Sequence, residues 1–209
     1  YTNSIVGSVR MCIRDSFVVH DGWLWFLTGG NPSGGNGYCL YRSNGTAAGT
    51  TSFVCDTGKY GLELFNDELY FSRSANAKGY ELWKTDGTTS GTVMVKDIYT
   101  GTNSALGDKY YSAGLFTSTE DYLFFSVKTG TATADNEIWR TDGTTAGTKL
   151  VKAGLVVADD VTIGNVVYIS GTQYFSNSAS IKGLWSTDGT TNGTTCLLYT
   201  SPSPRDLDL

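Results

Sequence analysis

Short apolar runs alternate with glycine-rich turns along most of this chain, and the same order of features occurs four times. In the clearest copy, the run Glu81–Lys84 precedes an Asp86-Gly87 pair and the run Val93–Lys96 follows it. Two runs of strand-forming residues on either side of an Asp-Gly pair predict a β-hairpin. Because Gly91 gives the connection a second flexible point, we expect a loop longer than the minimal two residues.

Versions of this hairpin recur at 37–56, 136–153 and 182–195, a spacing that is typical of arrays and propellers. Two further strands are predicted before each hairpin: first Phe17–Val19, Leu62–Phe65, Leu115–Thr117 and Val166–Ile169, then Trp23–Leu27, Leu69–Ser72, Leu123–Ser126 and Gln173–Ser176. No stretch shows a helical period. We therefore predict an all-β fold, a partial β-propeller of about four consecutive four-stranded antiparallel blades. The predicted repeats are about 17–61, 62–114, 115–162 and 163–195.

The turn pairs of the four copies are Asn44-Gly45, Asp86-Gly87, Asp142-Gly143 and Asp188-Gly189. An Asp or Asn side chain accepts hydrogen bonds from the backbone just beyond it, and glycine tolerates positive φ. Asn44 performs the same turn chemistry without a charge. We therefore interpret all eight residues as structural turn residues and not as a repeated charged site.

One aromatic side chain occupies the same position in each copy, namely Tyr41, Trp83, Trp139 and Trp185. The residue before it is always aliphatic: Leu40, Leu82, Ile138 or Leu184. Since successive side chains of a strand point to opposite faces, this strand is apolar on both faces, as in a blade packed between two others. We expect the four aromatic side chains to pack between blades; the alternative is an exposed row for stacking on carbohydrate.

The two ends of the sequence differ from the repeats. Met11–Ser16 and Cys196–Asp206 match translations of the transposon-end and adapter oligonucleotides used to prepare sequencing libraries. We interpret 1–16 and 196–209 as loosely attached adapter-derived tails around a propeller fragment at 17–195. The fourth hairpin is then expected to be incomplete, since only Thr194 and Thr195 follow its turn.

Excluding the tails leaves two cysteines, Cys39 and Cys55. Pairing Ser43 with Thr51 across the first hairpin would place these cysteines directly opposite each other. Opposed residues of an antiparallel pair can lie close enough for a disulfide. We therefore predict a possible disulfide between them.

The remaining composition limits the chemistry. The net charge is −5 at pH 7, with no basic stripe suited to nucleic acid, and no run is long and apolar enough to span a membrane. The single histidine, His20, is expected to be a solvated or hydrogen-bonded turn residue, and Asp159-Asp160 part of a solvated connection. Neither a phosphate loop nor a metal-ligand spacing is present, so we predict no catalytic, cofactor-binding or metal site.

The second copy carries a recognisable motif, Glu81-Leu82-Trp83-Lys84-Thr85-Asp86-Gly87-Thr88 followed by Gly91-Thr92. It resembles the ELWxxDGT repeat of bacterial surface and secreted proteins. The third copy matches nearly as well, the fourth lacks the Glu, and the first departs at Glu, Trp and Asp. The resemblance implies a propeller-like array in a larger exported protein, outside the cell or at its surface, with neighbouring blades as partners and no catalytic residues.

These observations favour a non-catalytic repeat scaffold or binding module, for example one used in adhesion to a surface glycan or protein. Ligand contacts are expected in the loops 28–37, 100–114 and 127–135, since loops on a rigid scaffold carry recognition. The alternative is the propeller part of a carbohydrate-active enzyme, sialidase-like or other, whose catalytic residues lie elsewhere. A sialidase-like site needs clustered arginines, whereas Arg42, Arg73 and Arg140 are predicted to be dispersed surface charges.

Overall fold

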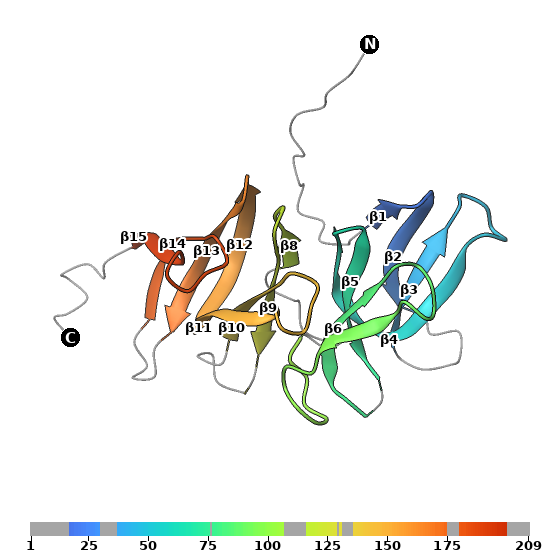
Figure 1. The fold of residues 1–209 in the computed structure, drawn as a ribbon, viewed down its shortest axis with the longest axis horizontal. Helices are drawn as coiled ribbons and strands as arrows, with labels where there is room; N and C mark the ends of the chain where they lie inside the picture. The colour runs from blue at the N-terminus through green and yellow to red at the C-terminus, as the bar shows by residue number, and fades with distance from the viewer. Residues whose placement is uncertain are drawn as a thin grey trace, which may run out of the picture.

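The computed structural model describes residues 17–29, 37–75, 77–106, 116–128, 130, 136–174 and 180–199 of the 209-residue chain. Every regular element in this part of the chain is a β-strand (Figure 1). The strands are β1 (Phe17–His20), β2 (Trp23–Gly29), β3 (Tyr38–Ser43), β4 (Thr51–Phe65), β5 (Glu68–Ser74), β6 (Tyr80–Thr85), β7 (Val93–Lys96), β8 (Phe116–Ser118), β9 (Leu123–Lys128), β10 (Asn136–Thr141), β11 (Lys149–Ala153), β12 (Leu155–Ile163), β13 (Val166–Tyr174), β14 (Ser180–Thr187) and β15 (Thr195–Tyr199). In the same residues, no helix is long and apolar enough to cross a membrane.

The described strands form three antiparallel sheets, one of seven strands (β1–β7) and two of four strands (β8–β11 and β12–β15), in which strands adjacent along the chain pair. The seven-stranded sheet divides within β4, so that we describe four units. Unit 1 consists of β1, β2, β3 and the first part of β4, and unit 2 of the last part of β4 with β5, β6 and β7. Unit 3 is β8–β11 and unit 4 is β12–β15. Strand β4 passes from unit 1 to unit 2 through a register shift between Thr57 and Leu62, where Gly61 has a φ of +83°. The all-β, antiparallel part of the predicted fold is therefore confirmed.

The units follow one another along the long axis of the molecule, with units 1 and 4 at opposite ends (Figure 1). Three apolar clusters lie between successive units. They include Trp25, Leu40, Leu69, Phe71 and Trp83 between units 1 and 2; Leu82, Val95, Leu123 and Phe125 between units 2 and 3; and Ile138, Val151, Val167, Ile169 and Trp185 between units 3 and 4. Since each fully buried large apolar side chain contributes about 1.5–3 kcal/mol, these contacts between units are the main source of stability.

A β-bulge occurs at the same place in every unit, between the aliphatic residue and the aromatic residue of the repeated motif. The bulge changes the register of the first hairpin. Arg42 pairs with Thr51, so the expected pairing of Ser43 with Thr51 is wrong. The bulge then shifts the register by one residue, and Cys39 still lies directly opposite Cys55.

Two strand assignments in the fourth repeat were also wrong. Val166–Ile169 and Gln173–Ser176 were expected to be separate strands, but β13 runs without a break from Val166 to Tyr174. The first strand of unit 4 is instead β12, which pairs with β13, so the boundary between units 3 and 4 lies near Gly154 and not at 162/163. Asp159 and Asp160 consequently belong to a strand and not to a connection.

The fourth hairpin is complete, contrary to the expectation from its sequence. Strand β15 (Thr195–Tyr199) pairs with β14 and has the same bulge as the other units. The apolar sequence Cys196–Tyr199 suits a strand, and the open edge of β14 offers it backbone partners. Its side chains gain little burial, since Leu197, Leu198 and Tyr199 are 52–65% exposed. The expectation of a loosely attached tail at 196–209 is therefore wrong for 196–199, which belong to β15. The rest of that segment and the predicted tail at 1–16 lie outside the described residues.

Candidate interaction site: the repeated turn and its seat

The turn after the third strand of each unit is held by hydrogen bonds between its own residues. In unit 3, Oδ1 of Asp142 accepts from the backbone N–H of Thr144 at 2.9 Å and from its hydroxyl at 2.7 Å. The Thr144 hydroxyl in turn accepts from the N–H of Gly147 at 2.9 Å. The hydroxyl of Thr148 donates to the Thr144 carbonyl at 2.6 Å and lies 2.7 Å from the hydroxyl of Thr141. The side chains of Thr141, Asp142, Thr144 and Thr148 therefore all have a partner within the loop.

The other turns repeat this network. Asn44 uses its Oδ1 in the same way, accepting from the N–H and hydroxyl of Thr46 at 3.1 and 2.8 Å. In the remaining copies, hydrogen bonds to the carboxylate lower the pKa of Asp86, Asp142 and Asp188. The bond from the threonine hydroxyl has the larger effect and the bond from the threonine N–H the next largest, and both stabilise the charged form. These geometries show how the motif residues tie down their own turns.

The later glycine of each turn, such as Gly91 or Gly147, cannot be replaced by a larger residue because the carboxylate of the turn aspartate lies against it. A Cβ placed on Gly147 would lie 2.0 Å from Oδ1 of Asp142, and one on Gly91 would lie 2.1 Å from Oδ1 of Asp86. No side chain fits at such a distance. The spacing from Asp to Gly in the motif is therefore set by contact between the two residues.

The glycine that directly follows the turn aspartate lies against the preceding unit. Gly87, Gly143 and Gly189 all have a positive φ of 88–93°. A Cβ on Gly87 would lie 3.4 Å from the Trp25 ring of unit 1, and one on Gly143 would lie 2.7 Å from the hydroxyl of Tyr70 in unit 2. The turn therefore also makes a docking contact, which sequence reasoning did not identify.

The surface that receives each turn has a constant composition, and we call it the seat. It consists of an aromatic residue of the second strand and the basic residue paired with it on the third strand. The seats are Trp25 with Arg42, Tyr70 with Lys84, and Phe124 with Arg140. Nη1 of Arg42 donates to the carbonyl of Gly87 at 3.4 Å, and a Cβ on Gly189 would lie 2.9 Å from Cδ of Arg140. Unit 4 carries the equivalent pair Tyr168 and Ser186, and no unit follows it among the described residues.

Additional polar contacts join units 2 and 3 beside the seat. The hydroxyl of Thr145 donates to the Val95 carbonyl at 2.7 Å, and Nζ of Lys96 donates to the Thr148 carbonyl at 2.7 Å. The same ammonium group lies 5.5 Å from the centre of the Trp139 ring. Between units 3 and 4, Lys152 lies 5.0 Å from the Trp185 ring, so the last strand of one unit places a cation over the motif tryptophan of the next.

The motif aromatic residues face the preceding unit. Trp83 and Trp185 are buried members of the clusters that join their units to the preceding ones, and Trp139 packs against the cluster between units 2 and 3. Tyr41 belongs to the first unit and stacks on Phe26 of the same unit, with ring centres 5.8 Å apart. In the three later units, the motif residue therefore packs between units.

The three arginines are not simple surface charges. Arg42 lies 4.7 Å from the Trp23 ring centre, Arg73 lies 4.8 Å from Trp83, and Arg140 lies 3.7 Å from Tyr122. Burial lowers the pKa of Arg73. The three residues come from β3, β5 and β10 and contact different aromatic rings, so the described structure does not bring them together as a carboxylate-binding cluster.

Glu81, the glutamate of the motif, has a role that the sequence did not indicate. It is fully buried, and its carboxylate accepts from the backbone N–H groups of Ile98 and Tyr99 at 2.9 and 3.3 Å. Burial raises its pKa to about 7, against the opposing effect of these hydrogen bonds. Glu81 therefore clamps the chain that leaves unit 2.

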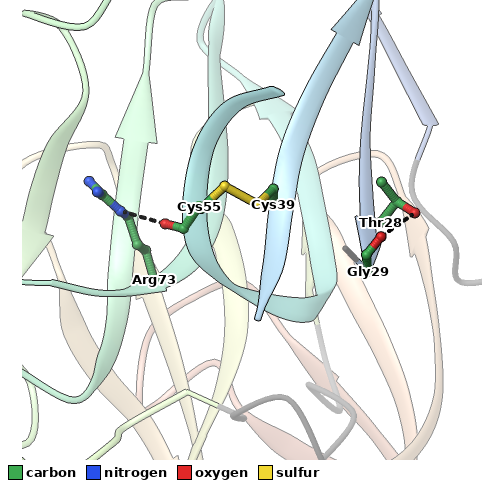
Figure 2. The surroundings of a disulfide bond; sticks show 5 residues. All are labelled: Thr28, Gly29, Cys39, Cys55 and Arg73. Carbon is green, nitrogen blue, oxygen red and sulfur yellow. Dashed lines mark hydrogen bonds between the residues drawn. A yellow bond between two sulfur atoms is a disulfide. The ribbon is translucent and has the colours of Figure 1, made fainter. Parts of the chain in front are cut away.

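The first unit has a disulfide at the positions equivalent to Glu81 and Asp97. Cys39 and Cys55 are joined with their Cα atoms 4.0 Å apart, and Nε of Arg73 donates to the Cys55 carbonyl at 3.2 Å (Figure 2). Figure 2 also shows Thr28 and Gly29, which lie at the end of β2. A covalent bond in unit 1 thus takes the place of the carboxylate clamp in unit 2.

The other sequence candidates lie apart from the seats. His20 is buried, not solvated, and its Nδ1 lies 3.6 Å from a carboxylate oxygen of Asp67. Among the described residues, no three His, Cys, Asp or Glu side chains come close enough to hold a metal ion. The three loops expected to bind a ligand, 28–37, 100–114 and 127–135, lie largely outside the described residues.

Comparison with known proteins gives a likeness of fold. No protein-family model and no curated protein sequence matches the chain. The chain is similar to puromycin hydrolase, with 12% identity and a TM-score of 0.61 over 86% of this chain and 28% of that protein. It is also similar to the acylaminoacyl peptidase of Pyrococcus horikoshii, with 10% identity and a TM-score of 0.50 over 84% of this chain and 30% of that protein.

A third likeness is weaker. An α-L-arabinofuranosidase from Clostridium thermocellum matches with 15% identity over 91% of this chain and 73% of that protein, and its TM-score of 0.39 is too low to support a shared arrangement. The chain thus spans less than a third of the first two proteins, and the comparisons show a fold and not an activity.

Proposed function

We propose that this chain is a segment of a β-propeller that serves as a non-catalytic repeat scaffold or binding module. The observation that carries the proposal is the turn-on-seat contact, which joins unit 2 to unit 1, unit 3 to unit 2 and unit 4 to unit 3 at equivalent positions. Repetition of one contact between four-stranded units is how propeller blades pack. The fold likeness to puromycin hydrolase also supports a β array within a larger protein.

The proposed lack of catalysis is supported by the partners of the polar side chains in the repeated motif. The threonine and aspartate side chains of the turns are bonded to one another, Glu81 is bonded to the backbone, and the arginines lie on aromatic rings. Side chains with these partners stabilise the turns and the contacts between units, which is a structural role. We further propose that the scaffold belongs to an exported bacterial protein, a proposal supported by the resemblance to the ELWxxDGT repeat and by the disulfide, which suits an oxidising compartment.

The test is a combined turnover and binding measurement on the full chain. We expect no hydrolysis of a panel of aryl glycosides and peptide aryl amides above the buffer rate, and retention of the labelled chain on an array of cell-surface glycans and proteins. Turnover that a mutation in the described residues abolishes would overturn the non-catalytic assignment. Absence of retention on every ligand of the array would reduce the proposal to a scaffold alone.

A further inference from the structure

The outward face of unit 1 carries residues whose counterparts are buried in every other unit. By strand register, Phe26 corresponds to Phe71, Phe125 and Ile169. Those three side chains are 0–1% exposed because each packs against the preceding unit, whereas Phe26 is only half-buried. Phe17, on the same face, is 65% exposed, and Val19 is 73% exposed. We call this surface the head face.

The outward face of unit 4 carries the complementary set, and we call it the tail face. Leu184 is 38% exposed, whereas its counterparts Leu40, Leu82 and Ile138 are 0–1% exposed because the following unit covers them. Val161, Ile163 and Leu198 lie on the same face and are 55–65% exposed. A monomer rarely exposes so many neighbouring apolar side chains without a partner surface.

The turn and its seat show the same complementarity. A Cβ placed on Gly45 would find no atom within 4 Å, whereas each of its three counterparts lies against a seat. The residues of this turn, Asn44, Gly45 and Thr46, are all exposed. At the other end, Tyr168 and Ser186 occupy the register positions of a seat, with serine in place of the basic residue, and no unit follows them among the described residues. The chain therefore carries one turn and one seat that match each other in register.

We propose that two copies of this chain associate head to tail, with the Asn44–Thr46 turn and head face of one copy on the Tyr168–Ser186 seat and tail face of the other. The contact is heterologous, since the two surfaces differ. A tail-to-tail contact would bring Leu184 against Leu184 but leave both seats without a turn. The inference rests on the contacts between units and not on the proposed lack of catalysis, so the two can fail separately.

Sedimentation velocity of the full chain tests the proposal. We expect the wild type to associate as its concentration is raised to about 0.1 mM, where even a weak complex is populated. Phe17→Arg places a charge on the head face and Leu184→Arg places one on the tail face, and each is expected to weaken association about tenfold or more. Leu150→Arg is the matched control, because Leu150 is 44% exposed on an internal unit, and it should associate like the wild type.

A mixture of the two variants distinguishes head-to-tail association from other modes. Each variant keeps one intact face, so an equimolar mixture of Phe17→Arg and Leu184→Arg should form a one-to-one dimer although each is monomeric alone. A dimer of Phe17→Arg alone would show a tail-to-tail contact, and a dimer of Leu184→Arg alone a head-to-head contact. A dimer of either variant alone would overturn the proposal. A wild type or a mixture that stays monomeric would also overturn it. Val19→Arg and Ile163→Arg, at more exposed positions, repeat the test if either first variant loses its β-sheet circular dichroism signal.

Discussion

Reduction of the Cys39–Cys55 disulfide should measurably destabilise unit 1. The bond joins residues 16 positions apart, and closing a loop of this size removes enough entropy from the unfolded chain to contribute about 3 kcal/mol. The clamp that Glu81 provides in unit 2 is absent at this position of unit 1, so reduction leaves no equivalent support. With a urea dependence of about 2–3 kcal/mol per molar, the unfolding midpoint should fall by about 1 M.

The assay is urea unfolding followed by tryptophan fluorescence, with and without a phosphine reductant. The sequence has two cysteines besides this pair, Cys12 and Cys196, so the measurement is made in a Cys12→Ser/Cys196→Ser background to prevent exchange. A Cys39→Ala/Cys55→Ala double variant should respond to reductant by less than the error of the fit. Since stability in repeat arrays is a sum of unit and interface terms, the change should occur in the transition that includes unit 1. Equal midpoints for the oxidised and reduced chain would refute the loop-closure reasoning.

Three further outcomes are expected from the turns and the clamp. Asp142→Asn should leave the thermal midpoint nearly unchanged, whereas Asp142→Ala should lower it, because only Ala removes the acceptor for Thr144; equal midpoints would show that this acceptor is unimportant. Gly147→Ala should lower the midpoint more than Ala146→Gly in the same turn, since its Cβ would meet the Asp142 carboxylate at 2.0 Å, and the reverse order would contradict the packing argument. The free energy of unfolding should fall as the pH rises from about 4.5 to about 7, because the buried Glu81 binds its proton more tightly in the folded chain than in the unfolded chain. Urea unfolding at a series of pH values measures this fall, and Glu81→Gln should remove the part of it that Glu81 contributes.

The hairpins could be predicted from sequence because their information is local. The partners of Asp142 lie within the same loop, so the spacing of Asp, Thr and Gly is sufficient to specify the turn. The alternation of Leu82 and Trp83 similarly indicated a strand with two buried faces. The bulge between these two residues was not indicated, because nothing in the residue types marks a change of register.

The errors arose where pairing overrides local pattern. Strand β12 contains Ala158, Asp159 and Asp160, which break the apolar pattern, and it forms because β13 offers a long paired edge. Strand β15 forms for a similar reason on β14. The seats were missed because Tyr70, Lys84 and Gly143 are far apart along the chain and meet only in the folded structure.

The self-contained turn also has an evolutionary consequence. Because its polar groups bond to one another and its docking contact always uses the same register positions, a duplicated unit would bring a complete turn and a complete seat with it. Each junction created by an in-frame duplication or deletion would then resemble the junctions already present. An array of this kind could therefore change length by recombination without a compensating substitution elsewhere. The turns at Asn44 and Asp142 differ in side chain but share one hydrogen-bond pattern, so the same turn geometry tolerates divergence between copies.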